Sequence, residues 1–256
     1  MTRLRIAAAI AVLTVPVLLV AQATPPAATS PATGGAPRAA TAPPRPAPKL
    51  PNGTPDLSGV WNGGGPIGDL AQGLPKGETI PLLPEAKKIM EARQSKDDPE
   101  ANCLPTGVPR IAPYPWRIVQ TPTHVFFLFE GNIHSFRQIF INGKHPDDPD
   151  PTWYGHSTGT WEGDTLVVDS VGFNDKFWFD FRGHPHSEKL HTVERYSRTN
   201  LGTLVVETTI NDPTYYSKPF TVTFNGRLRP TEELMEYICQ ENEQDSQHIK
   251  GPAGTP

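Results

Sequence analysis

The sequence predicts an all-β domain, an antiparallel meander of eight to ten short strands that closes into a barrel or folds as a sandwich. Three observations carry this prediction. The chain of 256 residues contains 30 prolines, but four long stretches after residue 122 contain none, and central strands tolerate proline poorly. Those stretches are rich in β-branched and aromatic residues with period-two alternation. Turn sequences such as Asn142-Gly143 and Asn225-Gly226 separate them.

The chain begins with a pattern typical of an export signal. Two arginines stand in residues 1–5, residues 6–20 are almost entirely apolar or small, and Ala21-Gln22-Ala23 is a cleavage sequence of the A-x-A kind. We therefore expect a signal peptide over 1–23 and an exported protein, periplasmic or secreted. The apolar run is shorter than the roughly 20 residues that a spanning helix needs, so no membrane span is expected. An uncleaved membrane anchor is the alternative.

Residues 24–50 consist mostly of alanine, proline, threonine and glycine. Such a segment buries too little apolar surface to offset its ordering entropy, so it predicts a disordered spacer. One β domain is then expected over 51–250, with a disordered tail over 251–256. Segment 1–50 holds five of the 23 basic residues and none of the 27 acidic ones, which leaves a net charge of −9 for the rest. This acidity argues against nucleic acid as a partner.

Within the domain, the elements can be placed in order. Pro84 and Glu85 begin, and Arg93 ends, a single surface helix. Strands are predicted where β-branched and aromatic residues gather, at 125–129, 166–168, 204–210 and 220–224. Cys103 and Cys239 are the two cysteines, and in an exported protein we expect them to form one disulfide that ties the front of the domain to its last strand. Two free buried thiols are the alternative.

Two resemblances extend this picture. Gly59-Val60-Trp61 resembles the G-x-W signature at the first strand of lipocalins and related calycin barrels, which implies a closed barrel with the tryptophan plugging one end. The segments Gly155–Asp169 and Gly183–Arg195 are similar to a family of exported bacterial proteins of unknown function, so this second resemblance implies export and assigns no catalytic residue.

Three histidines, His184, His186 and His191, stand within eight residues. A His-x-His pair on a strand presents both imidazoles on one face, and a third ligand from a neighbouring strand would complete a divalent metal site. Pro185 argues against a regular strand here. The alternative is a polar loop whose histidines bond to the backbone.

His156 and Asp169 form a second candidate pair. If Glu162 and Gly163 are the tip of a two-residue hairpin, His156 faces Asp169 across the two strands. The carboxylate would then orient the imidazole for general-base catalysis. Gly155–Gly159 also matches the G-x-S-x-G nucleophile elbow around Ser157, but that motif needs a following helix, whereas a strand is predicted.

Aromatic side chains supply candidate pocket walls. Five of them lie within 173–181, among them Phe177 and Trp178, and they line a pocket or pack in the core. One face of another predicted strand carries His134, Phe136, Gln138 and Phe140. If this face points into a barrel, it would line a second pocket. The alternative is that the histidine is a buried, hydrogen-bonded structural residue.

We expect a small-molecule enzyme without an organic cofactor, a lyase, isomerase or hydrolase that uses imidazole and carboxylate acid–base chemistry. A lipocalin-like carrier of an apolar or aromatic molecule is the main alternative, and an envelope scaffold is a third. The expected catalytic residues are His156, Asp169, His184, His186 and Glu194, the expected substrate-binding residues are His134, Phe177, Trp178 and Arg195, and the expected ligands of a possible divalent metal are His184, His186 and His191.

Overall fold

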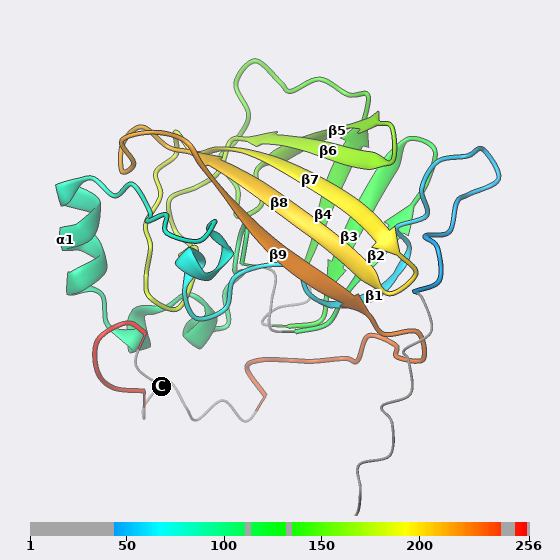
Figure 1. The fold of residues 1–256 in the computed structure, drawn as a ribbon. Helices are drawn as coiled ribbons and strands as arrows, with labels where there is room; N and C mark the ends of the chain where they lie inside the picture. Colours follow the sequence, from blue (N-terminus) through cyan, green and yellow to red (C-terminus); the bar gives the residue numbers. More distant parts are fainter. Residues whose placement is uncertain (1–43, 111–113, 132–134, 242–248, 255–256) are drawn as a thin grey trace, which may run out of the picture. The chain divides into compact units, whose positions relative to one another are not determined.

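The computed structural model describes residues 44–110, 114–131, 135–241 and 249–254. Within these ranges, nine strands form one closed barrel in which each strand pairs with its neighbours in sequence and β9 pairs back onto β1 (Figure 1). The predicted barrel is confirmed. The strands are β1 (Gly59–Gly63), β2 (Trp116–Gln120), β3 (His124–Phe129), β4 (Ser135–Ile141), β5 (His156–Glu162), β6 (Thr165–Val171), β7 (His191–Asn200), β8 (Thr203–Asn211) and β9 (Phe220–Leu228).

One pairing departs from the predicted antiparallel meander. β4 and β5 are parallel, and only Ile139–Ile141 pair with Ser157–Gly159, whereas the other pairings of the barrel are antiparallel. Asn142-Gly143 ends β4 as a turn but does not form a hairpin. The connection 142–155 instead carries the chain back, so that β5 starts near the middle of β4 and runs in the same direction. Among the described residues, the first half of β4 therefore has no partner strand on this side.

The barrel interior is filled by side chains, because every second residue of the strands points inward. The inward-pointing apolar side chains form one cluster inside the barrel. Its largest members are Trp61, Trp116, Phe127 and Tyr196, all without exposed surface. Trp61 donates its ring N–H to the carbonyl oxygen of Leu57 at 2.9 Å. Its ring also lies 5.0 Å from the guanidinium of Arg198.

A second apolar cluster packs the loop between β6 and β7 against the ends of β8 and β9. Phe173, Phe177 and Phe179 of this loop are completely buried against residues such as Ile210 and Val222. Four of the five aromatic side chains of segment 173–181 are therefore buried in the protein. These large apolar rings hold the long loop in place.

The helical elements are short. The predicted surface helix is confirmed as α1 (Pro84–Ala92), which buries only Ala86 and lies at the periphery of the barrel (Figure 1). Three 3₁₀ turns complete the described elements: η1 (Leu70–Gly73), η2 (Ser95–Asp97) and η3 (Glu100–Asn102). No helix in the described ranges combines the length and apolarity needed to cross a membrane.

The predicted disulfide is confirmed, since Cys103 bonds to Cys239 across 136 positions of sequence. Its second partner was placed wrongly, because Cys239 lies eleven positions beyond the end of β9 rather than in the last strand. The bond therefore fixes the segment after the barrel to the segment before β2.

Candidate active site

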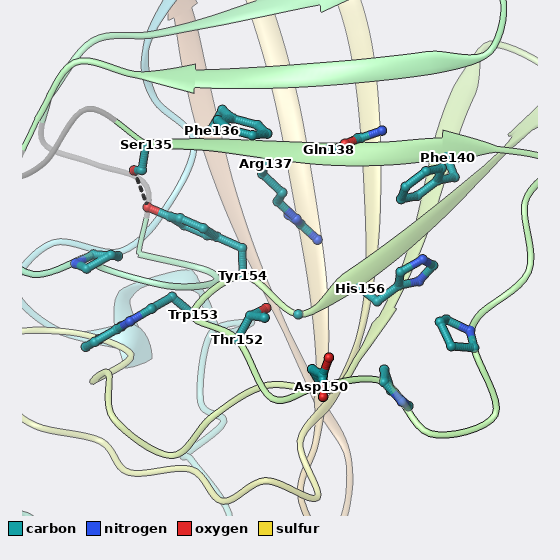
Figure 2. A pocket seen from close by; sticks show the side chains of 14 residues that line it. Ser135, Phe136, Arg137, Gln138, Phe140, Asp150, Thr152, Trp153, Tyr154 and His156 are labelled. Carbon is teal, nitrogen blue, oxygen red and sulfur yellow. Dashed lines mark hydrogen bonds between the residues drawn. The ribbon is translucent and has the colours of Figure 1, made fainter.

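A pocket of about 640 Å³ lies beside the unpaired first half of β4 (Figure 2). One wall is the outer face of β4, and the opposite wall is the end of the connection 142–155, which leads into β5. Figure 2 shows Phe136, Gln138 and Phe140 in a row along β4, with residues of the connection facing them. The lining residues are Pro105, Ser135, Phe136, Arg137, Gln138, Phe140, Pro146, Pro149, Asp150, Thr152, Trp153, Tyr154, Gly155 and His156.

Gly155 controls how the chain enters this site. Its φ is +64°, a left-handed conformation that side chains disfavour. A Cβ atom here would also lie 2.6 Å from the backbone oxygen of Val171. Only glycine therefore lets the connection turn tightly against β6 and begin β5 with His156 at the pocket.

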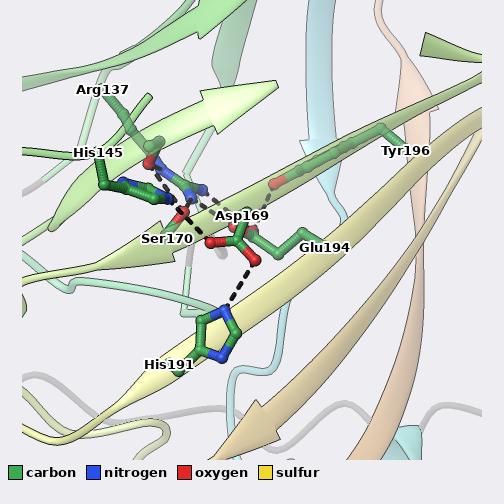
Figure 3. A network of polar contacts seen from close by, with 8 residues as sticks. Arg137, His145, Asp169, Ser170, His191, Glu194 and Tyr196 are labelled. Carbon is green, nitrogen blue, oxygen red and sulfur yellow. Dashed lines mark hydrogen bonds and ion pairs between the residues drawn. The ribbon is translucent and has the colours of Figure 1, made fainter. Parts of the chain in front are cut away.

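His156 is the first member of a chain of four titratable side chains on the outer barrel wall. Its Nδ1 lies 2.9 Å from Nδ1 of His145, and Nε2 of His145 lies 2.9 Å from Oδ1 of Asp169. The other oxygen of Asp169 lies 2.8 Å from Nε2 of His191. Figure 3 shows Asp169 between His145 of the connection and His191 of β7. Thr158 Oγ1 lies 3.4 Å from His145 Nε2.

The predicted register of the β5–β6 hairpin was wrong by two residues. Glu162 pairs with Thr165, so the loop is Gly163-Asp164, His156 faces Val171, and Asp169 faces Thr158. Gly163 has a φ of +60°, and a glycine with positive φ is what the first loop position of a type II′ turn requires. A shift of two keeps both side chains on the same face of the sheet. His145, which the sequence prediction missed, joins them.

The donors and acceptors of this chain determine where its protons lie. A carboxylate only accepts hydrogen bonds, so His145 donates to Asp169 from Nε2. A neutral imidazole has one N–H, so Nδ1 of His145 accepts, and the proton of that contact belongs to Nδ1 of His156. The Nε2 atom of His156 is then left with a free lone pair.

His156 is also held in its neutral form. Burial lowers the pKa of His156 below the usual 6.5, and the neighbouring His145 lowers it further. The ring of Phe140 stacks on the imidazole at a centroid distance of 5.0 Å with the planes 9° apart. A neutral imidazole with an available lone pair is suited to take a proton at neutral pH.

A different network fills the polar part of the barrel interior. Arg137 donates to both carboxylate oxygens of Glu194, to Ser157 Oγ at 3.0 Å and to Ser170 Oγ at 2.7 Å. Tyr196 donates its hydroxyl to Glu194 at 2.7 Å. Burial is the largest single influence and disfavours the charge of Arg137, but the charges of Glu194 and Tyr196 and the hydrogen bonds to them together outweigh it and raise the pKa of Arg137. Burial, followed by the charge of Glu194, raises the pKa of Tyr196.

This network corrects two predictions. Phe136, Gln138 and Phe140 point away from the barrel interior, because the alternate residues Arg137 and Ile139 are the buried ones. Glu194, predicted as a catalytic residue, is completely buried inside the barrel as the partner of Arg137. The predicted pocket within the barrel is thus replaced by a pocket at its wall. His134 lies outside the described residues.

The loop histidines do not join the chain on the barrel wall. Nδ1 of His184 lies 2.6 Å from Oδ2 of the buried Asp180. His186 is 2% exposed and packs between Phe177 and Phe179, and burial lowers its pKa to about 4. Its Nε2 has no hydrogen-bond partner in the described part of the protein. The alternative of a polar loop whose histidines bond to the backbone fits only in part, because Nδ1 of His186 lies 3.3 Å from the backbone oxygen of Ser187, whereas His184 bonds to a carboxylate and both imidazoles are buried.

The proposed metal triad is not assembled. In the described part of the chain, the group of three side chains with ligand atoms within 4.8 Å of one another is Asp69, Asp180 and His184, without His186 or His191. Asp180 already accepts hydrogen bonds from the backbone of Leu70 and His184. Its carboxylate is thus committed to holding η1 against the loop.

The remaining predicted residues also lie apart from the pocket. Phe177 and Trp178 are buried in the second apolar cluster or beside it, and Trp178 packs under the guanidinium of Arg93 at 4.7 Å. Arg195 is on the outer face of β7 and forms an exposed ion pair with Glu162 at 2.9 Å.

In comparisons with protein-family models, curated protein sequences and solved structures, no match was found.

Proposed function

We propose that this protein is an exported enzyme that acts on a small molecule without an organic cofactor, and that His156 is its general acid–base residue. The observation that carries the proposal is the ordered contact series from Asp169 through His145 to His156, which ends at a pocket large enough for a small molecule. Lyase, isomerase and hydrolase reactions all use proton abstraction and return of this kind.

The chemistry follows from the tautomers. A substrate X–H bond breaks, its electron pair stays on the substrate, and the proton goes to Nε2 of His156. The proton on Nδ1 of His156 then passes to Nδ1 of His145. The positive charge thereby comes to lie on His145, beside the carboxylate of Asp169, where it is best stabilised. Reversal of these steps returns the proton to the product.

His191 has a positioning role in this scheme. It bonds to the second oxygen of Asp169 and so fixes the carboxylate plane that faces His145. Glu194, His184 and His186 are given structural roles, because the first is paired with Arg137 and the other two lie in the loop before β7.

Solvent deuterium tests the proposal even when neither substrate nor product has been identified. The protein is incubated in D₂O with mixtures of small metabolites, and mass spectrometry records both consumption and deuterium incorporation, since a base that abstracts and returns a proton exchanges it with solvent. We expect His156→Gln to slow this reaction by about 10² to 10⁴-fold.

His124→Gln is the matched control, because His124 also packs against Phe140, at 5.1 Å, but does not line the pocket. It should retain the reaction. Unchanged turnover or exchange in His156→Gln would remove His156 from the mechanism.

A binding protein is the second candidate, favoured by the aromatic and proline side chains that make up much of the pocket wall. In that case a ligand is recovered unchanged and without deuterium after prolonged incubation, and His156→Gln alters affinity only.

Export is proposed from the N-terminal pattern, with the disulfide as support, because such bonds persist in oxidising compartments. Mass spectrometry of the protein from a secreting host should show a chain that begins at Thr24, and an intact Met1 would contradict cleavage.

A further inference from the structure

We infer that the ligand of the β4–β5 pocket is an organic cation, an apolar or aromatic molecule that carries a protonated or quaternary amine. This inference deepens the proposed function by naming the class of molecule that occupies the same site. It rests on the charges and the aromatic rings that the pocket presents.

The charge of the pocket is negative. Two lining residues carry a full charge, Asp150 and Arg137. Arg137 is 1% exposed in its side chain, and its charge is balanced by the two oxygens of Glu194. Asp150 is exposed and has no hydrogen-bond or ion-pair partner among the described residues. The uncompensated charge that faces an entering ligand is therefore that of a carboxylate.

The same connection adds net negative charge next to the lining residues, because its two further aspartates outnumber Lys144. Asp147 and Asp148 stand between the lining residues Pro146 and Pro149, and both are exposed. His156 is kept neutral by its lowered pKa and so does not offset them. A cationic molecule gains from these carboxylates on approach and in the complex, whereas an anionic one is repelled.

Aromatic faces supply the second half of the recognition. Phe136, Phe140, Trp153 and Tyr154 line the pocket from its two walls. Phe136 is 61% exposed and lies on the same wall as the partly exposed Phe140, so the two rings offer an apolar surface that a ligand can cover. Rings around a carboxylate attract an ammonium group through their faces and pack against its apolar substituents.

Sugars also stack on aromatic rings, but the lining gives them few polar partners. Ser135 and Tyr154 bond to each other at 2.9 Å, so their hydroxyls are already engaged. The remaining polar groups are Gln138, Asp150, Thr152, the indole N–H of Trp153 and Nε2 of His156, which is a small set for a molecule with many hydroxyls. The unpaired carboxylate among rings favours the cation.

Calorimetry with three probes of similar size tests this inference. Benzyltrimethylammonium carries the positive charge, 2-phenylethanol is neutral, and 3-phenylpropionate is negative. We expect the ammonium compound to bind about tenfold more tightly than the alcohol, an advantage that weakens with salt, and the carboxylate to bind most weakly.

Two variants locate the effect. Asp150→Asn should remove most of the preference for the ammonium compound and leave the binding of the alcohol unchanged. Asp175→Asn is the control, because Asp175 is an exposed carboxylate in the loop after β6, away from the pocket lining. This variant should behave as the unmodified protein.

The results separate this inference from the proposed function. Charge preference that persists in His156→Gln supports the cation site independently of catalysis. Equal binding of the three probes, tighter binding of the carboxylate, or a preference for oligosaccharides over the ammonium compound would overturn the inference, even where turnover depends on His156. A preference that survives Asp150→Asn would also overturn it.

Discussion

The hydrogen bond between His156 and His145 joins the Nδ1 atoms of the two rings, so one Nδ1 must donate its proton and the other must accept it. Asp169 decides which, because it takes the Nε2 proton of His145. A carboxylate two hydrogen bonds away from the pocket-lining His156 thereby determines which nitrogen of that imidazole keeps its lone pair.

Arg137 is expected to be essential for stability. Arg137→Met leaves the completely buried Glu194 without its cation, and loss of one partner of a buried ion pair costs about 3 to 5 kcal/mol. The double variant with Glu194→Met should recover much of this loss, because it removes the unpaired charge. Guanidinium denaturation of both variants measures the effect. A single variant within about 1 kcal/mol of the original protein would show that the pair is not required.

His186 should make the protein less stable in mild acid. Its folded pKa of about 4 lies below the unfolded value near 6.5, so between these pH values only the unfolded chain binds the proton. Stability is complete above pH 6.5 and falls as the pH drops toward 4, by about 3 kcal/mol from this group. His186→Phe should lack this component of the pH dependence when denaturation is followed from pH 7 to pH 4. Identical pH profiles would contradict a buried neutral imidazole.

Two glycine turns, one on each side of β5, determine how the site is assembled. The turn at Gly155 starts β5, and the turn at Gly163 sets the β5–β6 register. Both glycines have φ near +60°, but a Cβ at Gly155 meets the backbone of Val171, whereas no atom of the described residues lies within 4 Å of a Cβ at Gly163. An alanine at Gly163 therefore tests backbone strain alone, whereas an alanine at Gly155 tests backbone strain together with a steric clash.

Gly155→Ala is expected to be the more damaging of two alanine substitutions. Gly163→Ala should lower the free energy of unfolding by only about 1 kcal/mol, the cost of a left-handed backbone at alanine. Gly155→Ala has the same cost and must also displace the start of β5, and with it His156. Thermal denaturation and probe binding should show a larger stability loss and weaker binding for Gly155→Ala alone. Equal effects in both variants would mean that the close contact with Val171 is easily relieved.

The disulfide ties two elements that lie far apart in the chain. Closing a loop of 136 positions removes unfolded-state entropy worth about 5 kcal/mol in the chain-entropy model. Replacing both Cys103 and Cys239 by serine should lower the free energy of unfolding by up to this amount. Denaturation with and without reductant gives the same comparison on the unmodified chain. A change below about 1 kcal/mol would show that other contacts already hold the segment after β9.

The sequence predicted the positions of the strands and the helix better than the register and facing of the strands. Proline-free alternation located the strands, and Pro84 located the helix, because both signals are local. The register failed by two residues because Glu-Gly and Gly-Asp are both plausible hairpin loops at 162–164, and only the positive φ of Gly163 decides between them. The prediction of which face of β4 points into the barrel was wrong, because both sets of alternate residues in this strand mix polar and apolar side chains. The buried Arg137 is explained by Glu194, 57 positions away.

At the scale of the whole molecule, the barrel works as a scaffold around a filled core. Two tryptophans and the Arg137–Glu194 network occupy its interior, so the pocket is found where the parallel β4–β5 pairing leaves half of β4 uncovered. Sequence reasoning expected the pocket inside the barrel because it assumed a continuous antiparallel meander. The connection 142–155 supplies both His145 and the acidic pocket wall, which is why a single unusual connection changes the location of the whole site.

The central claim is that Asp169 and His145 fix the proton of His156, and long-range ¹H–¹⁵N spectra of the histidine rings measure it most directly. At pH 8 we predict His156 in its Nδ1–H form and His145 in its Nε2–H form, and Asp169→Ala should release both rings from these tautomers. His124 serves as the internal reference, because its Nδ1 contacts Thr123 and not Asp169. A spectrum with the proton of His156 on Nε2, or one that Asp169→Ala leaves unchanged, would contradict the account.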